Sequence, residues 1–149
     1  KIKTLLGHVG AWSPKPEQLA TGKFLHLKEM EEYLDNFRNR IDSRLEGFHQ
    51  VFTNLKEKGF PVDAIAPEAA IYLTVKLDLI GAITPGNVKI ESVEQVFEYI
   101  LNDAGIALVP FYAFGSPKDL PWFRLSVGTT RSEDIPKIDE SLTKSLSKL

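Results

Sequence analysis

The chain contains no cysteine among its 149 residues. Thiol catalysis, thiolate metal ligands and a disulfide scaffold are therefore excluded, and a reducing cytosol is permitted. An excess of one charge is also lacking, because 18 Lys and Arg residues against 20 Asp and Glu residues give a net charge of −2. Since no basic block stands out, nucleic acid is not expected as a partner.

Long apolar runs are missing as well. The most apolar stretches, 69–75 and 77–83, are interrupted by polar residues and fall far short of the roughly 20 residues that a bilayer requires, so no membrane partner is expected. The length nevertheless suits one domain, and 43% hydrophobic residues provide enough apolar material for a core. The first residues, KIKTLL, are neither an initiator Met nor a signal peptide, which predicts that the chain is part of something longer.

A long amphipathic helix is the clearest pattern in the first half of the chain. Apolar residues recur in steps of three and four from Leu27 to Leu55, with a mean spacing of 3.5 residues, and Lys58-Gly59 supplies a suitable end. A 3.5-residue repeat also occurs in coiled coils, but this seam is rich in Phe, which favours packing on a sheet. A shorter helix beginning near Pro16 is expected to precede it.

Three strands and two helices are expected in the second half. Residues 69–77 alternate as a strand, with Tyr72 on one face and Leu73 on the other, and residues 106–109 and 122–127 are predicted as two more strands. Ser92 and Gln95 have capping-box spacing, and Ser132 is expected to cap the last helix. The sequence thus predicts an α+β fold, with helices packed on a small, mostly antiparallel sheet and one long helix near the N-terminus.

Most catalytic patterns are absent. The histidines, His8, His26 and His49, lack metal-ligand spacing, so no metal site is expected. The chain also lacks a Gly-x-Ser-x-Gly elbow, a phosphate-binding Gly-rich loop and a Walker motif. We therefore do not expect a complete enzyme within these residues.

Arg124 is the most unusual charged residue, because it falls in the middle of a predicted strand. Its planar guanidinium can grip a carboxylate or phosphate through two parallel N–H groups. Two interpretations remain open on this evidence: an anion-binding arginine, or a structural one on an edge strand or paired with Asp78 or Glu91. The loop before this strand contains Tyr112 and Phe114. Aromatic side chains at such a position either wall a pocket or plug the end of the core.

Several segments together resemble the C-terminal part of the class I and II pyridoxal-phosphate aminotransferases of fold type I. They are LNDAGIALVP (101–110), FG (114–115) and FRLS (123–126), in the family's order and spacing. Upstream, APEAAIYL (66–73) is similar to the family's Pro-x-Gly-x-Phe-Tyr strand, and downstream SEDI (132–135) is similar to the start of its closing helix. Ser13-Pro14 and Gln18 are similar to the loop and helix start that follow the family's cofactor-lysine segment.

This resemblance implies a fold and a role for particular residues. Residues 27–149 would form the small C-terminal domain, and residues 1–26 a remnant of the large cofactor-binding domain with the interdomain segment. In the family, the arginine at the position of Arg124 binds the α-carboxylate of the substrate. The loop of Trp12 and Ser13 lies near the family's dimer interface, while Tyr112 and Phe114 are candidate pocket residues.

The protein implied is a dimeric, cytoplasmic transferase of amino acid metabolism. Its cofactor would be pyridoxal 5′-phosphate, and its substrates an amino acid and a 2-oxo acid. The family places the cofactor lysine in the large domain before position 1, so the isolated chain holds no catalytic residue and is expected to be inactive. Two departures concern the pocket: Phe111 and Tyr112 replace Gly and Ser or Thr, and Glu68 or Ala69 replaces a Gly.

Two other functions remain open at this stage. A fold type I pyridoxal-phosphate lyase would need the same carboxylate-binding arginine. An independent regulatory module that binds an anion or an amino acid would also suit the α+β layering. We expect the carboxylate-binding role of Arg124 to be common to the aminotransferase and the lyase.

Overall fold

The computed structural model describes residues 1–10 and 13–149 and divides them into two compact units, Lys1–Arg38 and Asn39–Leu149. The first unit holds α1 (Ile2–Val9) and α2 (Lys15–Phe24), and α2 begins with Pro16 in its first turn and has no buried residue. A proline is favoured there because the first helical N–H groups have no partner in the helix. Helix α2 confirms the shorter helix expected to begin near Pro16.

Helix α3 (Met30–Glu57) confirms the long amphipathic helix and shortens it by three residues at its start. Residues 25–29 form turns instead of helix. The buried residues of α3 all lie in its second half: Ile41, Leu45, Phe48, Val51, Phe52 and Leu55. The helix is followed by Gly59 with φ 90°, a left-handed conformation that glycine adopts without steric cost and that commonly ends helices.

The second unit contains a four-stranded antiparallel sheet in the order β1-β2-β4-β3. Its strands are β1 (Val62–Ala64), β2 (Tyr72–Leu77), β3 (Val109–Pro110) and β4 (Trp122–Ser126). The register pairs Tyr72 with Ser126 and Lys76 with Trp122, so β4 lies between β2 and β3. This order makes β2 and β4 the inner strands.

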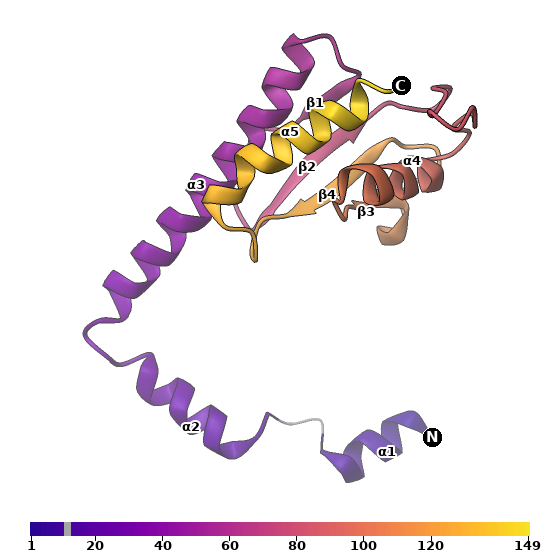
Figure 1. Ribbon diagram of the computed structural model, residues 1–149. Coiled ribbons are helices and arrows are strands. Elements are labelled where there is room, and N and C mark those ends of the chain that lie inside the picture. Colours follow the sequence, from indigo (N-terminus) through magenta and orange to yellow (C-terminus); the bar gives the residue numbers. More distant parts are fainter. Residues whose placement is uncertain (11–12) are drawn as a thin grey trace. The chain divides into compact units, whose positions relative to one another are not determined.

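Helices cover one face of this sheet (Figure 1). Helix α4 (Val93–Tyr99) continues into a π-helical turn, η1 (Ile100–Ala104), and α5 (Ile135–Leu146) packs beside it through a hydrogen bond from the Tyr99 hydroxyl to the Ser145 carbonyl at 2.8 Å. Alternate strand residues face the same core, including Leu73, Val75, Phe123 and Leu125. The opposite residues of β2 and β4 stay partly exposed.

Two local expectations were wrong. The strand predicted over 106–109 is reduced to Val109–Pro110 at the sheet edge. An edge position tolerates a proline, which has no N–H to donate to a neighbouring strand. Ser132 does not cap the last helix, because residues Ser132–Asp134 form a 3-10 turn and α5 begins at Ile135 with no side-chain cap. Strand β1 was not foreseen.

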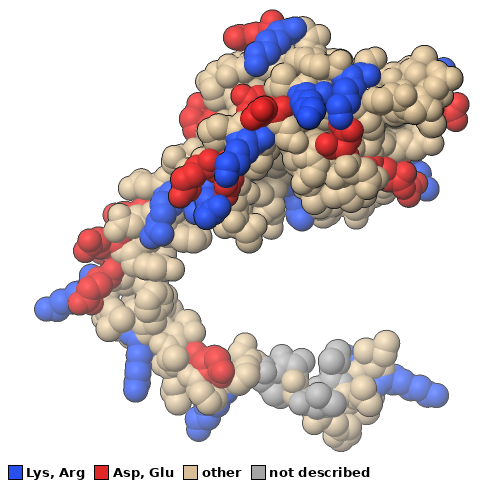
Figure 2. Space-filling model, viewed as in Figure 1, with Lys and Arg blue, Asp and Glu red and all other residues tan. Residues whose placement is uncertain are grey.

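Lys and Arg side chains intermingle with Asp and Glu side chains on the face of the molecule that Figure 2 shows, where both signs follow α3. This agrees with the small net charge of −2. Among the residues that the structure describes, no helix is both long and apolar enough to cross a membrane.

Candidate functional site: the Arg124 face of the sheet

Arg124 lies on an inner strand, on the sheet face that the helices leave uncovered. Its cross-strand neighbours are Thr74 of β2 and Val109 of β3. Side chains alternate along a strand, so burying Phe123 and Leu125 in the core directs Arg124 to the other face. The structure therefore contradicts the edge-strand interpretation of this arginine.

The end of β4 is fixed by a second arginine. Arg44 of α3 donates from Nη1 to the Gly128 carbonyl at 3.1 Å and lies 3.5 Å from the Val127 carbonyl oxygen. These contacts tie the backbone that follows β4 to the helical layer. Arg124 thus projects from a strand held by two neighbouring strands and by a helix.

Two aromatic rings flank the Arg124 guanidinium. Its central carbon lies over the Tyr72 ring at 4.3 Å from the centroid and over the Phe114 ring at 4.7 Å. Tyr72 begins β2, whereas Phe114 ends the 3-10 turn η2 (Phe111–Phe114), which follows β3 directly. The negative face of an aromatic ring attracts a cation at such distances, so both rings hold the guanidinium in place.

No carboxylate neutralises Arg124 within the described part of the chain. The ion pairs found there do not include it, and Asp78, one of the partners considered from the sequence, instead pairs with Lys76 at 2.9 Å. The Nε atom of Arg124 is buried and has no hydrogen-bond partner among these residues. An arginine held by rings keeps its N–H donors available for an anion.

A cavity of about 240 Å³ lies against β2, and Arg124 itself does not line it. Its lining includes Tyr72 and Thr74, the ring partner and the cross-strand neighbour of Arg124, together with the loop 65–69. The loop leads into Ala70, which has φ 67°, a left-handed conformation that costs a residue with a Cβ about 1–2 kcal/mol. Glu68 and Ala69, one of which stands where the family has a glycine, also line the cavity.

The other candidate site residues are distributed as follows. Phe114 contacts Arg124, but Tyr112 turns toward the core and packs against it. Ser13 is exposed in the first unit, where its backbone carbonyl accepts a hydrogen bond from the side-chain amide of Gln18. Trp12 lies outside the described residues.

Tyr72 and Thr74 are the site residues that sequence analysis missed. The alternation of residues 69–77 already placed both side chains on the polar face of their strand. What the alternation could not supply was the pairing of β2 with β4, which brings that face next to Arg124.

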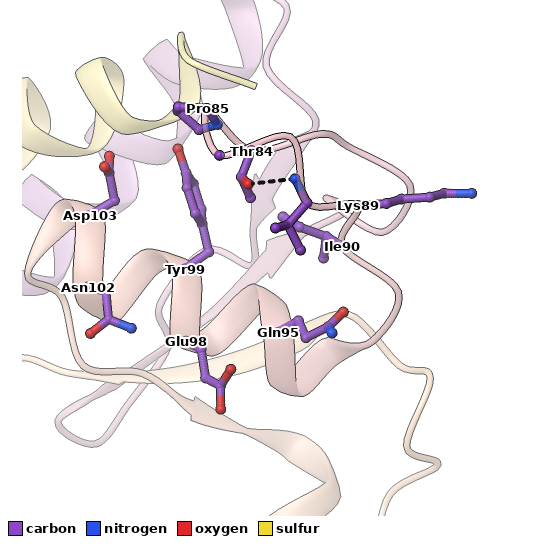
Figure 3. A pocket seen from close by; sticks show the side chains of 11 residues that line it. Thr84, Pro85, Lys89, Ile90, Gln95, Glu98, Tyr99, Asn102 and Asp103 are labelled. Atoms are coloured by element: carbon purple, nitrogen blue, oxygen red, sulfur yellow. Dashed lines mark hydrogen bonds between the residues drawn. The ribbon is translucent and has the colours of Figure 1, made fainter.

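A larger cavity, of about 450 Å³, lies between the turn 84–90 and the helical segment of α4 and η1 (Figure 3). Tyr99 points toward the turn, and Lys89 points away from the cavity (Figure 3). Several polar groups are already satisfied within the protein: the Tyr99 hydroxyl donates to Ser145, and Asp103 pairs with Lys148 at 2.7 Å. Its lining contains neither Arg124 nor the rings beside it.

Charged partners shift few pKa values. The hydrogen bond from Lys148 holds the pKa of Asp103 below its usual value of 3.8, and a hydrogen bond from Lys56 does the same for Asp63.

In residues 1–10 and 13–149, no group of three or more His, Asp or Glu side chains is placed to hold a metal ion.

Comparison with known proteins gives one family. The model of the class I and II aminotransferases matches residues 8–140. An aspartate aminotransferase of Rhizobium meliloti (strain 1021) is 29% identical over 105 residues, which are 70% of this chain and 23% of that protein. The chain therefore spans about a quarter of the length of this curated relative.

Solved structures resemble the fold. The crystal structure of the Rhizobium meliloti aspartate aminotransferase has a TM-score of 0.58 at 27% identity, over 82% of this chain and 28% of that chain. An aromatic aminotransferase from Pyrococcus horikoshii OT3 has a TM-score of 0.67 at 23% identity, over 87% and 31%. Cystalysin from Treponema denticola, whose structure contains a pyridoxal 5′-phosphate cofactor, has a TM-score of 0.62 at 18% identity, over 80% and 27%. The last two show the likeness of the fold alone.

Proposed function

This chain belongs to the class I and II aminotransferases, and from that premise we propose that it is the small C-terminal domain of an enzyme that transfers an amino group from an amino acid to a 2-oxo acid. Residues 1–26 would then belong to the large domain and the segment that joins the two. The observation that carries the proposal is the guanidinium of Arg124, which no carboxylate neutralises within the described residues.

We assign to Arg124 the binding of the substrate's α-carboxylate. A guanidinium offers two parallel N–H groups that match the two oxygens of a carboxylate. Every amino acid and every 2-oxo acid carries this group, so one arginine serves both substrates of a transamination. The inner position of β4 between two strands limits the movement of the arginine's backbone.

The residues round Arg124 do not form a binding site for pyridoxal 5′-phosphate. Lys76, a lysine on the same sheet face, is paired with Asp78, so it does not offer a free amine to the cofactor. We therefore propose that the cofactor is held by parts of the enzyme that this chain does not span. When bound, the cofactor supplies the electron sink of the amino transfer.

The enzyme is proposed to act as a homodimer, with Trp12 and Ser13 near the interface.

Replacing Arg124 with Ala in the whole enzyme tests the assignment. The change removes a charge-assisted paired contact and leaves the substrate carboxylate without a partner, which costs roughly 2–5 kcal/mol. We expect kcat/KM for an amino acid to fall by about 30-fold to about 5,000-fold. Arg124→Lys keeps the charge but not the planar pair of donors, so it is expected to restore only part of this loss.

Arg131→Ala is the matched control, because Arg131 is an exposed arginine that pairs with Asp134. Its kinetics should equal those of the wild type. Wild-type kcat/KM in the Arg124→Ala enzyme would refute the assignment of Arg124 to the substrate carboxylate.

A further inference from the structure

The rings beside Arg124 approach it from the two neighbouring strands. Tyr72 belongs to β2, and Phe114 follows β3 in the turn η2, while β4 lies between β2 and β3. The guanidinium carbon is 4.3 Å from one ring centroid and 4.7 Å from the other. In the part of the chain that the structure describes, the two rings make no ring contact with each other. The cation thus separates the rings.

Rings hold a cation differently from a carboxylate. A carboxylate would occupy two of the five N–H donors of arginine, whereas a ring attracts the charge through its π face and uses none of them. Tyr72 is 39% exposed and Phe114 55% exposed, and each ring contacts the guanidinium. Their contact with Arg124 gives these exposed rings a role in fixing its side chain.

The direction from which a ligand can reach Arg124 is restricted. Nε is buried, so the edge that contains it is closed. The two Nη groups are not among the buried atoms without a partner, and no hydrogen bond from them is found in the described residues, so they face solvent. With the rings on the flanks, the Nη edge is the open approach.

We infer that Tyr72 and Phe114 are positioning residues that make this site select a planar carboxylate over a tetrahedral anion of equal charge. A carboxylate can lie in the guanidinium plane and accept both Nη donors. A sulfonate has a third oxygen that must leave this plane, where it meets the negative face of a ring. The inference rests on the proposed function, because it refines what Arg124 binds.

Inhibition of the whole enzyme by two matched monoanions tests the inference. Propionate and ethanesulfonate have the same alkyl chain and the same charge but differ in the shape of the anion. We expect the wild type to bind propionate about 10-fold more tightly than ethanesulfonate. In Tyr72→Leu and Phe114→Leu the preference should fall to about 3-fold or less, because a ring no longer covers one flank.

Conservative variants separate positioning from general damage. Tyr72→Phe and Phe114→Tyr keep a ring at each position and should keep the 10-fold preference. The leucine variants should raise KM for the amino acid by about 5-fold while kcat changes little, since they disturb the binding of a group remote from the reacting bonds. Thermal unfolding checks that each variant is folded.

Three outcomes separate this inference from the proposed function. Loss of propionate binding in Arg124→Ala, with loss of selectivity in the leucine variants, supports both. Loss of binding in Arg124→Ala with unchanged selectivity in both leucine variants overturns the inference alone. Undiminished propionate binding in Arg124→Ala overturns the carboxylate-binding role proposed for Arg124, and the inference with it.

Discussion

Asp103 links the π-helical end of α4 to the C-terminal residues after α5. Lys148 Nζ lies 2.7 Å from both carboxylate oxygens of Asp103, and the side chains are 26% and 35% exposed for Asp103 and Lys148. The hydrogen bond from Lys148 lowers the pKa of Asp103 in the folded state. A carboxyl group with a lowered pKa stabilises the fold above its unfolded-state pKa, and this contribution disappears as pH falls through the folded-state pKa.

We expect Asp103→Asn to lower the free energy of unfolding by about 0.5–1 kcal/mol at pH 7, because the pair is partly exposed and screened by solvent. The difference from the wild type should shrink as pH falls below the ordinary aspartate pKa of about 3.9 and through the lower pKa of Asp103 in the folded state. Urea unfolding across this pH range measures it. Asp119→Asn, at an exposed aspartate without an ion pair in the described residues, is the control. A pH-independent difference would contradict the prediction.

At the scale of the element, the start of α4 depends on its cap. The Ser92 hydroxyl accepts a hydrogen bond from the backbone N–H of Gln95 at 3.3 Å. The side-chain oxygen of Gln95 accepts one from the backbone N–H of Glu91 at 2.6 Å. Ser92→Ala leaves a helix N–H without its acceptor and should cost about 1 kcal/mol of unfolding free energy. Ser92→Asp keeps an acceptor and should stay close to the wild type. Equal stability of the alanine and aspartate variants in urea would refute the role of the cap.

Elements with a periodic pattern were predicted well from the sequence. Helix α3 and strand β2 show their spacing directly, and the capping residues of α4 are local signals. Strand β1 has three residues and β3 has two, which is too short for a period to be visible. Leu101 lies where α4 gives way to the π turn and is 38% exposed, which the apolar pattern of this helix does not indicate.

Only part of the candidate site could be predicted from the sequence, because local patterns do not specify how distant strands pair. The alternation along β4 identifies the face of Arg124 from neighbouring residues alone. Its contact with Tyr72 depends on the pairing of two distant strands, which no local pattern specifies. Tyr112 and Phe114 were grouped as pocket residues, yet the tight turn η2 directs only Phe114 to Arg124 and turns Tyr112 to the core.

At the scale of the whole molecule, the buried core residues that the structure describes all lie in the unit Asn39–Leu149, from Ile41 to Leu146. Deleting residues 1–28 therefore removes no described core side chain. We expect the shortened chain to unfold within about 2 °C of the 149-residue chain in a thermal melt followed by circular dichroism.

Deletion of residues 135–149 is the matched comparison. It removes Leu142 and Leu146, which are buried, and should abolish the cooperative transition. A large fall in the melting temperature after the deletion of 1–28 would show that the first unit contributes to the stability of the second.

The strand order has a consequence for the growing chain on the ribosome. β4, the strand that carries Arg124, pairs with β2 through residues 46 to 54 positions apart, from Lys76–Trp122 to Tyr72–Ser126. At roughly 5–20 residues per second, synthesis needs about 3–10 s to cover that interval. During this time β4 has not been made, so the edge of β2 that β4 will cover, with Leu73 and Val75 beside it, stays open to wrong partners. The arginine strand is therefore also the one that closes the nascent sheet against aggregation.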